Sequence, residues 1–85
     1  MKVRVRFFAS LKEQLGRDAE EIEVPGGIGT VAALRAHLMK RGGEWQAVFA
    51  EKKLVRAAVN QEMAPPGAAI KAGDEVAFFP PVTGG

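Results

Sequence analysis

The chain has 85 residues, of which 47% are hydrophobic, and its 12 basic and 10 acidic residues leave a formal net charge of only +2. These values predict one small domain with a packed core, and they argue against a disordered chain or a strongly basic nucleic-acid-binding protein. The absence of cysteine excludes disulfide scaffolds, thiolate zinc sites and thiol catalysis.

No apolar run in the sequence is long enough to span a bilayer. The first residues, Met1 to Arg4, alternate charged and apolar side chains and do not resemble a signal peptide. We therefore expect a cytoplasmic protein with no membrane partner, no nucleic-acid partner and no metal site.

The N-terminal third predicts a strand followed by a short helix. Apolar and basic residues alternate from Val3 to Phe7, a period of two that is typical of a half-buried strand. Ser10 lies three residues before Glu13, the spacing of a capping box at the start of a helix. Gly16 can supply the left-handed residue that ends this helix.

The middle of the chain predicts a second strand and the main helix. Ile22 and Val24 alternate with glutamates, and the glycines of residues 26–29 then form a flexible turn without the Lys-Ser/Thr of a phosphate loop. Thr30 is a suitable N-cap for a helix that runs to about Arg41. One apolar stripe of this helix faces the core: Val31, Leu34 and Leu38.

The second half predicts a helical turn, a strand and a final strand. Residues 44–50 form the helical turn, residues 55–59 the strand, and Asn60 favours a turn after it. The two prolines within residues 63–67 predict an irregular segment. After Gly73 a last strand begins, with Val76 and Phe78 on one face.

The final strand runs into Pro80 and Pro81, which stop it because neither has a backbone N–H for a sheet ladder. Residues 82–85 can extend about 13 Å at roughly 3.3 Å per residue. They end in Gly84 and Gly85, which fit a channel too narrow for a Cβ; the alternative is a frayed tail. We predict a domain over residues 1–79 and an extended tail over residues 80–85.

The segment DEVAFFPPVTGG, from Asp74 to Gly85, resembles the end of the small subunits of molybdopterin synthase, the MoaD-type sulfur carriers with a ubiquitin-like fold. The resemblance extends to AAVNQ, residues 57–61, and to VRVRFFASLKE, residues 3–13. It covers most of the chain, and the Phe-Phe-Pro-Pro approach is more specific than the Gly-Gly end.

The resemblance implies an α+β fold of the β-grasp (ubiquitin-like) type, a mixed sheet with one main helix packed on one face. In that fold the first and last strands lie side by side and parallel. Phe8 and Phe79 would then meet outside the core and form an aromatic patch at the base of the tail. Exposed patches of this kind usually mark a partner-binding site.

The residues show no constellation that would make this chain an enzyme alone. The distinctive group is the terminal carboxylate of Gly85, which has an ordinary pKa of about 3.5 and is a poor electrophile when ionised. Adenylation by an ATP-using partner would activate it, and a sulfur donor could then convert the acyl-adenylate to a thiocarboxylate.

The resemblance implies that this sulfur enters the molybdopterin dithiolene. The partners would be a ubiquitin-activating-type adenylating enzyme, a sulfur donor and the large subunit of molybdopterin synthase, with which the chain would form a heterotetramer. No cofactor would be bound permanently, since the activating partner uses the ATP. Phe79 and Phe8 would bind the partner, and five residues would thread the tail: Pro80, Pro81, Val82, Thr83 and Gly84.

Other functions remain open at this point. A carrier for thiamine synthesis or tRNA thiolation shares the Gly-Gly end, although the Phe-Phe-Pro-Pro approach argues against the thiamine carrier. A ubiquitin-like protein modifier would use the same activation and end in an isopeptide bond. A nucleic-acid-binding module would need a clustered basic face with stacking aromatics, whereas these basic residues are spread along the chain.

Overall fold

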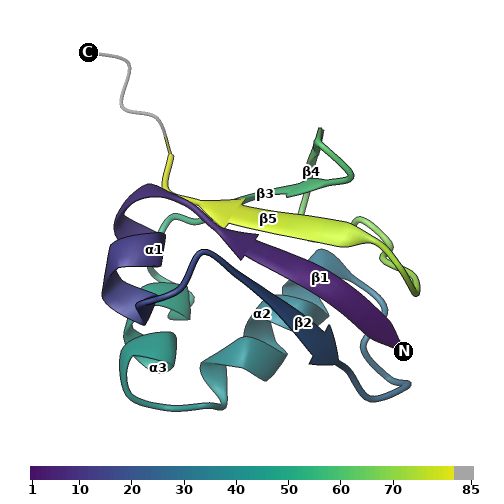
Figure 1. Cartoon of the computed structure of the whole chain (residues 1–85), viewed down its shortest axis with the longest axis horizontal. Helices are drawn as coiled ribbons and strands as arrows, with labels where there is room; N and C mark the ends of the chain where they lie inside the picture. The colour runs from purple at the N-terminus through teal and green to yellow at the C-terminus, as the bar shows by residue number, and fades with distance from the viewer. Residues whose placement is uncertain (82–85) are drawn as a thin grey trace.

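The computed structural model describes residues 1–81, which form five strands and three helices (Figure 1). The elements in chain order are β1 (Lys2–Phe7), α1 (Ala9–Leu15), β2 (Ala19–Glu23), α2 (Val31–Met39), α3 (Glu44–Phe49), β3 (Arg56–Val59), β4 (Glu62–Ala64) and β5 (Glu75–Phe79). None of the helices in this part of the chain has the length and apolar composition needed to cross a membrane.

The five strands form one mixed sheet in the order β2-β1-β5-β3-β4. The central strands β1 and β5 are parallel, and the other three pairs are antiparallel. The helices cover one face of this sheet and leave the other face open (Figure 1). A sheet whose first and last strands form the parallel central pair, with the main helix across one face, confirms the expected β-grasp fold.

The core lies between the sheet and the helices, as the alternation in β1 and β5 predicts. Phe7 and Phe78 are almost fully buried, and they are direct neighbours in the register of the two central strands. The rings of Phe49 and Phe78 pack edge to face, with centroids 5.1 Å apart. Most of the remaining core is aliphatic: Val3, Val5, Leu11, Ile22, Val24, Val31, Leu34, Leu38, Val48, Ile70 and Val76.

The main helix α2 begins as the sequence predicts and ends slightly earlier. The Thr30 Oγ1 accepts a hydrogen bond from the Ala33 N–H at 3.1 Å, which satisfies one donor of the first turn. After Met39 the chain tightens, because the N–H groups of Arg41 and Gly42 each donate to the carbonyl three residues back. The α-helical hydrogen bonding therefore ends before Arg41.

The predicted capping box at Ser10 and Glu13 is wrong. Helix α1 begins at Ala9, and Ser10 already lies within its first turn. The chain stays bonded to the sheet through Phe8, whose N–H donates to the Phe78 carbonyl at 3.1 Å, and then turns at once at Ala9 with φ +54°. The predicted C-terminal cap is confirmed, since Gly16 is left-handed with φ +73°.

The prediction of an irregular segment over residues 63–67 is wrong at its start. Residues 62–64 form strand β4, which pairs with β3 in a hairpin. Asn60 and Gln61 both have positive φ, +50° and +70°, the backbone geometry of a two-residue turn that matches the twist of paired strands. The tight turn returns the chain to the sheet edge before Pro65 can interrupt the pairing.

Candidate partner-binding site at the end of the central strands

The end of β5 connects the sheet to the predicted tail. Pro80 and Pro81 follow β5 directly and are half-buried. The expectations for Val82, Thr83, Gly84 and Gly85 concern residues that lie outside the part of the chain that the structure describes. The part of the site that can be described is therefore the surface around the end of β5, next to Pro80.

The two phenylalanines at the end of β5 lie on opposite faces of the sheet. Phe78 is 1% exposed and packs against Phe49 under the helices. Phe79 follows it and is half-buried on the open face, because successive side chains of a strand alternate.

Phe8 and Phe79 reach the same end of the open face from two strands. Phe7 is the register partner of Phe78, so the next residue of each chain continues alongside the other. Phe8 keeps an extended backbone, with φ −124° and ψ 156°, and its side chain is exposed. The structure thus brings together the two aromatic residues that the sequence selects for partner binding.

The sheet register adds three residues that sequence reasoning missed. Ala77 of β5 pairs with Ala58 of β3, which in turn pairs with Met63 of β4. Side chains directly opposite one another in a sheet share a face, and Met63 is 62% exposed. Met63 could not be assigned to this face from the sequence, because strand β4, which contains it, was not predicted.

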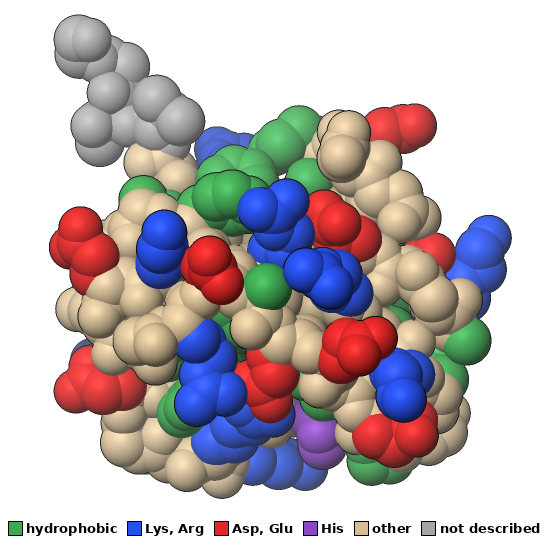
Figure 2. Space-filling view, in the orientation of Figure 1, with side chains coloured by type: hydrophobic (Ala, Val, Ile, Leu, Met, Phe, Trp, Pro, Cys, Tyr) green, Lys and Arg blue, Asp and Glu red, His purple; other side chains and the backbone are tan. Residues whose placement is uncertain are grey.

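We use the name outer patch for the five apolar residues that share this face: Phe8, Ala58, Met63, Ala77 and Phe79. Figure 2 shows hydrophobic side chains gathered near the end of β5, with Lys and Arg side chains beside them. An apolar patch with charged neighbours is typical of a protein-binding surface.

The guanidinium of Arg6 lies at the edge of the outer patch. Its Cζ is 5.0 Å from the centroid of the Phe8 ring, within the range of a cation–π interaction. Its Nη1 lies 3.9 Å from the Glu75 carboxylate, too far for a hydrogen bond. The positive charge is therefore held beside the patch by weak attractions.

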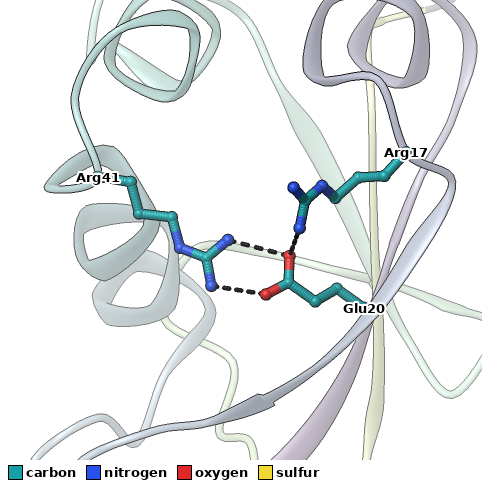
Figure 3. A network of polar contacts seen from close by, with 3 residues as sticks. All are labelled: Arg17, Glu20 and Arg41. Carbon is teal, nitrogen blue, oxygen red and sulfur yellow. Dashed lines mark hydrogen bonds and ion pairs between the residues drawn. The ribbon is translucent and has the colours of Figure 1, made fainter.

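A second charged cluster lies on the helix side of the sheet and has a structural role (Figure 3). Glu20 of β2 accepts from the Arg17 Nη1 at 2.6 Å and from both Nη atoms of Arg41 at 3.0 and 2.8 Å. The Arg41 guanidinium also lies 4.5 Å from the Trp45 ring centroid. Hydrogen bonding from Arg41, and then from Arg17, lowers the pKa of Glu20. The cluster joins β2 to the end of α2.

A buried carboxylate fixes the other end of β5. Asp74 accepts hydrogen bonds from the Asn60 Nδ2 at 3.0 Å and from the Lys71 N–H at 2.9 Å. The Asn60 Oδ1 in turn accepts from the Glu75 N–H at 3.0 Å. The bond from Asn60 is the main cause that lowers the pKa of Asp74. These hydrogen bonds connect the β3–β4 turn to the start of β5. They therefore help to fix the register of β3 against β5, on which the outer patch depends.

Comparisons with known proteins agree with this geometry. A model of the ThiS family matches residues 5–85. The molybdopterin synthase sulfur carrier subunit of Haemophilus influenzae is 45% identical over 83 residues, which cover 98% of this chain and 99% of that protein.

Two solved structures are similar over nearly their whole length. The small archaeal modifier protein 1 of H. volcanii has a TM-score of 0.75 and 28% identity, covering 95% of this chain and 98% of that chain. A chain in the protein–protein complex of subunits 1 and 2 of the molybdopterin-converting factor from Helicobacter pylori has a TM-score of 0.66 and 26% identity, with all of both chains covered.

Proposed function

Since the chain belongs to the ThiS family, we propose that it is a sulfur carrier of molybdenum cofactor biosynthesis and the small subunit of a molybdopterin synthase. The observation that carries the proposal is the 45% identity to a sulfur carrier subunit over 98% of this chain. The open apolar face at the end of β5 supports it, because a carrier must dock on the proteins that load and unload it.

The chemistry takes place at the C-terminal carboxylate of Gly85. A carboxylate oxygen attacks the α-phosphorus of ATP on an adenylating enzyme of the ubiquitin-activating type, and pyrophosphate leaves. Hydrosulfide supplied by the sulfur donor then attacks the acyl carbon, the C–O bond to AMP breaks, and a thiocarboxylate remains with no change in oxidation state. Activation is needed because the free carboxylate, with a pKa of about 3.5, is ionised at neutral pH.

The remaining residues of this chain bind the partner proteins and orient the C-terminal acyl group. The outer patch docks on each partner, and Pro80 and Pro81 direct the tail away from the sheet. Residues 82–84 place the acyl group in the partner's active site, and Gly84 lets the chain pass a narrow channel because it has no Cβ. The sulfur of Gly85 is delivered to the dithiolene of molybdopterin.

The partners are the large subunit of molybdopterin synthase, an adenylating enzyme and a sulfur donor, all in the cytoplasm. The similarity to a chain from a complex of subunits 1 and 2 of a molybdopterin-converting factor supports the first of them. We propose a heterotetramer of two small and two large subunits.

The test is the intact mass of the protein purified from cells that make molybdenum cofactor. We expect a fraction in which one oxygen is replaced by sulfur, and we expect this fraction to convert precursor to molybdopterin when the large subunit is added. A chain truncated after Thr83 is the control and should show neither. Unmodified protein throughout, or full activity of the truncated chain, would overturn the proposal.

The similarity to a small archaeal modifier protein supports protein conjugation as a second candidate function. The same acyl-adenylate would then be attacked by a lysine amine, and AMP would again leave. An immunoblot of the same cells distinguishes the two functions, because conjugates form a ladder above the mass of the carrier. Restoration of molybdoenzyme activity, thiamine synthesis or tRNA thiolation in strains that lack each carrier separates the sulfur pathways.

A further inference from the structure

The six arginines of the chain divide by the face of the sheet on which they lie. Arg17, Arg35 and Arg41 are on the helix side, and each donates hydrogen bonds to acceptors of this chain. Arg4, Arg6 and Arg56 are on the open face, where, within residues 1–81, none of the three side chains donates a hydrogen bond to the protein.

The sheet register shows which basic residues on the open face stand directly opposite a carboxylate and which do not. Near the start of β1, Lys2 is paired with Glu23, and Arg4 is paired with Glu21. Such cross-strand pairs of opposite charge are mutually stabilising.

The pattern changes toward the outer patch. Arg6 has Ala19 on one side and Ala77 on the other, and Arg56 has Phe79 beside it. Positive charge with no carboxylate directly opposite it therefore lies at the two edges of the outer patch. The Glu75 carboxylate lies near Arg6, but it is 3.9 Å from the Arg6 Nη1 and too far for a hydrogen bond.

The Arg6 guanidinium has N–H donors without an acceptor within residues 1–81. A guanidinium carries five N–H donors and no acceptor. The Nε of Arg6 is buried without a hydrogen-bond partner, and the nearest carboxylate, that of Glu75, is 3.9 Å from Nη1. An unsatisfied buried donor is unfavourable. A partner carboxylate that draws the Arg6 side chain outward relieves this cost, so its contact stabilises the complex more than a contact with a fully solvated arginine would.

We propose that Arg6 and Arg56 are guanidinium contacts for carboxylates of the protein that docks on the outer patch. The partner surface that fits has an apolar centre for Phe8 and Phe79, with Asp or Glu side chains at two points on its edge. Guanidinium and carboxylate match as a planar, two-pronged pair, which adds direction to the attraction. This inference rests on the proposed function, because it takes the docking partner to be the large subunit.

The two arginines act on different steps of binding. Arg6 is 41% exposed and lies over the Phe8 ring, so its contact is covered once the patch is docked. Loss of a covered charge pair mainly speeds dissociation. Arg56 is exposed and its contact lies at the rim, where charge mainly speeds association and loses effect in salt.

The experiment measures association and dissociation rates with the purified large subunit of molybdopterin synthase, at low and high salt. We expect Arg6→Leu to raise the dissociation rate on the order of tenfold to a hundredfold. Arg56→Leu should lower the association rate several-fold and flatten its salt dependence. Arg6→Lys should restore association and leave dissociation fast, because an ammonium cannot form the two-pronged pair.

Arg4→Leu is the matched control, since Arg4 is on the same strand and face but stands directly opposite Glu21 and Glu75 in the sheet register. It should bind like the wild type, and all four variants should keep the wild-type unfolding temperature. If the wild type binds, but Arg6→Leu and Arg56→Leu have the same association and dissociation rates as Arg4→Leu, the inference about the two arginines is overturned and the proposed function stands. Failure of the wild type to bind would overturn the proposed function and the inference with it. Wild-type binding to single-stranded RNA that the same variants abolish would overturn it in favour of a nucleic-acid partner.

Discussion

The two faces of the sheet use the same residue types in opposite ways. On the helix side, Phe78 is buried, and Arg35 donates to the carbonyls of Phe49, Ala50 and Lys53. On the open face, Phe79 is only half-buried, and Arg56 has no hydrogen-bond acceptor within residues 1–81. Phe78 and Arg35 are thus packed or hydrogen-bonded within this chain, whereas Phe79 and Arg56 on the open face remain accessible.

This difference separates residues that stabilise the fold from residues that serve binding. A substitution on the helix side should change the free energy of unfolding and reach function only through it. A substitution on the open face should change binding at constant stability. Matched pairs of variants, one on each face, test whether the separation holds.

The largest difference is expected between Phe78→Arg and Phe79→Arg. Phe78 is 1% exposed, so the first variant loses a packed ring and buries a charge. Loss of a core phenylalanine alone costs about 3–5 kcal/mol, close to the whole stability of a small domain. We expect Phe78→Arg to be unfolded by circular dichroism, while Phe79→Arg stays folded and loses affinity for the large subunit. Identical behaviour of the two variants would contradict the assignment of faces.

The next effect concerns the predicted tail over residues 80–85, which follows β5 directly in the sequence. We expect Gly84→Val to slow sulfur transfer about a hundredfold, because a branched side chain next to the reacting carbon displaces it by about 1 Å. Thr83→Val is the control, since it changes a hydroxyl for a methyl of nearly equal size. Adenylate formation and single-turnover sulfur transfer are measured separately. A wild-type rate for Gly84→Val in both assays would exclude a narrow channel.

A smaller difference is expected between Arg35→Met and Arg56→Met. Arg35 donates three hydrogen bonds, of 2.9, 2.7 and 2.7 Å, to carbonyls at and beyond the end of α3. Their loss should cost about 2 kcal/mol and lower the unfolding temperature by about 10 °C. Arg56→Met should stay within about 0.5 kcal/mol of the wild type. Equal melting temperatures would show that the acceptors of Arg35 are as well satisfied by water.

The smallest effect depends on pH. The hydrogen bond from Asn60 and the N–H of Lys71 hold the pKa of Asp74 below its unfolded value. The stability that the charged form contributes is therefore fully present above the unfolded pKa of about 3.9, and it is lost as the pH falls through the lower, folded pKa. Asp74→Asn should be less stable by on the order of 1 kcal/mol at pH 7, and its stability should fall less steeply in acid.

Urea unfolding between pH 7 and pH 2 measures this effect. Asp18→Asn is a suitable control, because Asp18 is exposed in the loop between α1 and β2. An acid profile of Asp74→Asn that runs parallel to the wild type would contradict the stabilising role of the charged Asp74.

Local patterns were enough to predict most of the fold. The alternation of Val3 to Phe7 and the Thr30 cap each specify an element whose partners are close in sequence or follow from burial. The Ser10 capping box failed because a hydrogen bond between distant segments, Phe8 to Phe78, decides where α1 starts. Strand β4 was hidden because Pro65 and Pro66 follow it directly.

Only part of the candidate site could be predicted from the sequence, again because contacts between distant segments decide the rest. Phe8 and Phe79 stand out as aromatic residues next to strand ends. Met63, in contrast, joins the outer patch only through the register of β3 and β4. The lack of a carboxylate directly opposite Arg6 likewise depends on the sheet register, and a shift of one residue would change every such pair.

Strand β5 is at once the middle of the sheet and the last of its five strands to be synthesised. While a nascent chain still holds β5 inside the ribosome, the β1–β2 and β3–β4 hairpins have no strand between them, and the long-range pairings on which the fold depends cannot form. The outer patch needs residues from β3, β4 and β5, so it exists only when synthesis has passed Phe79. A partner that recognises this surface therefore distinguishes chains that contain β5 from chains that stop before it.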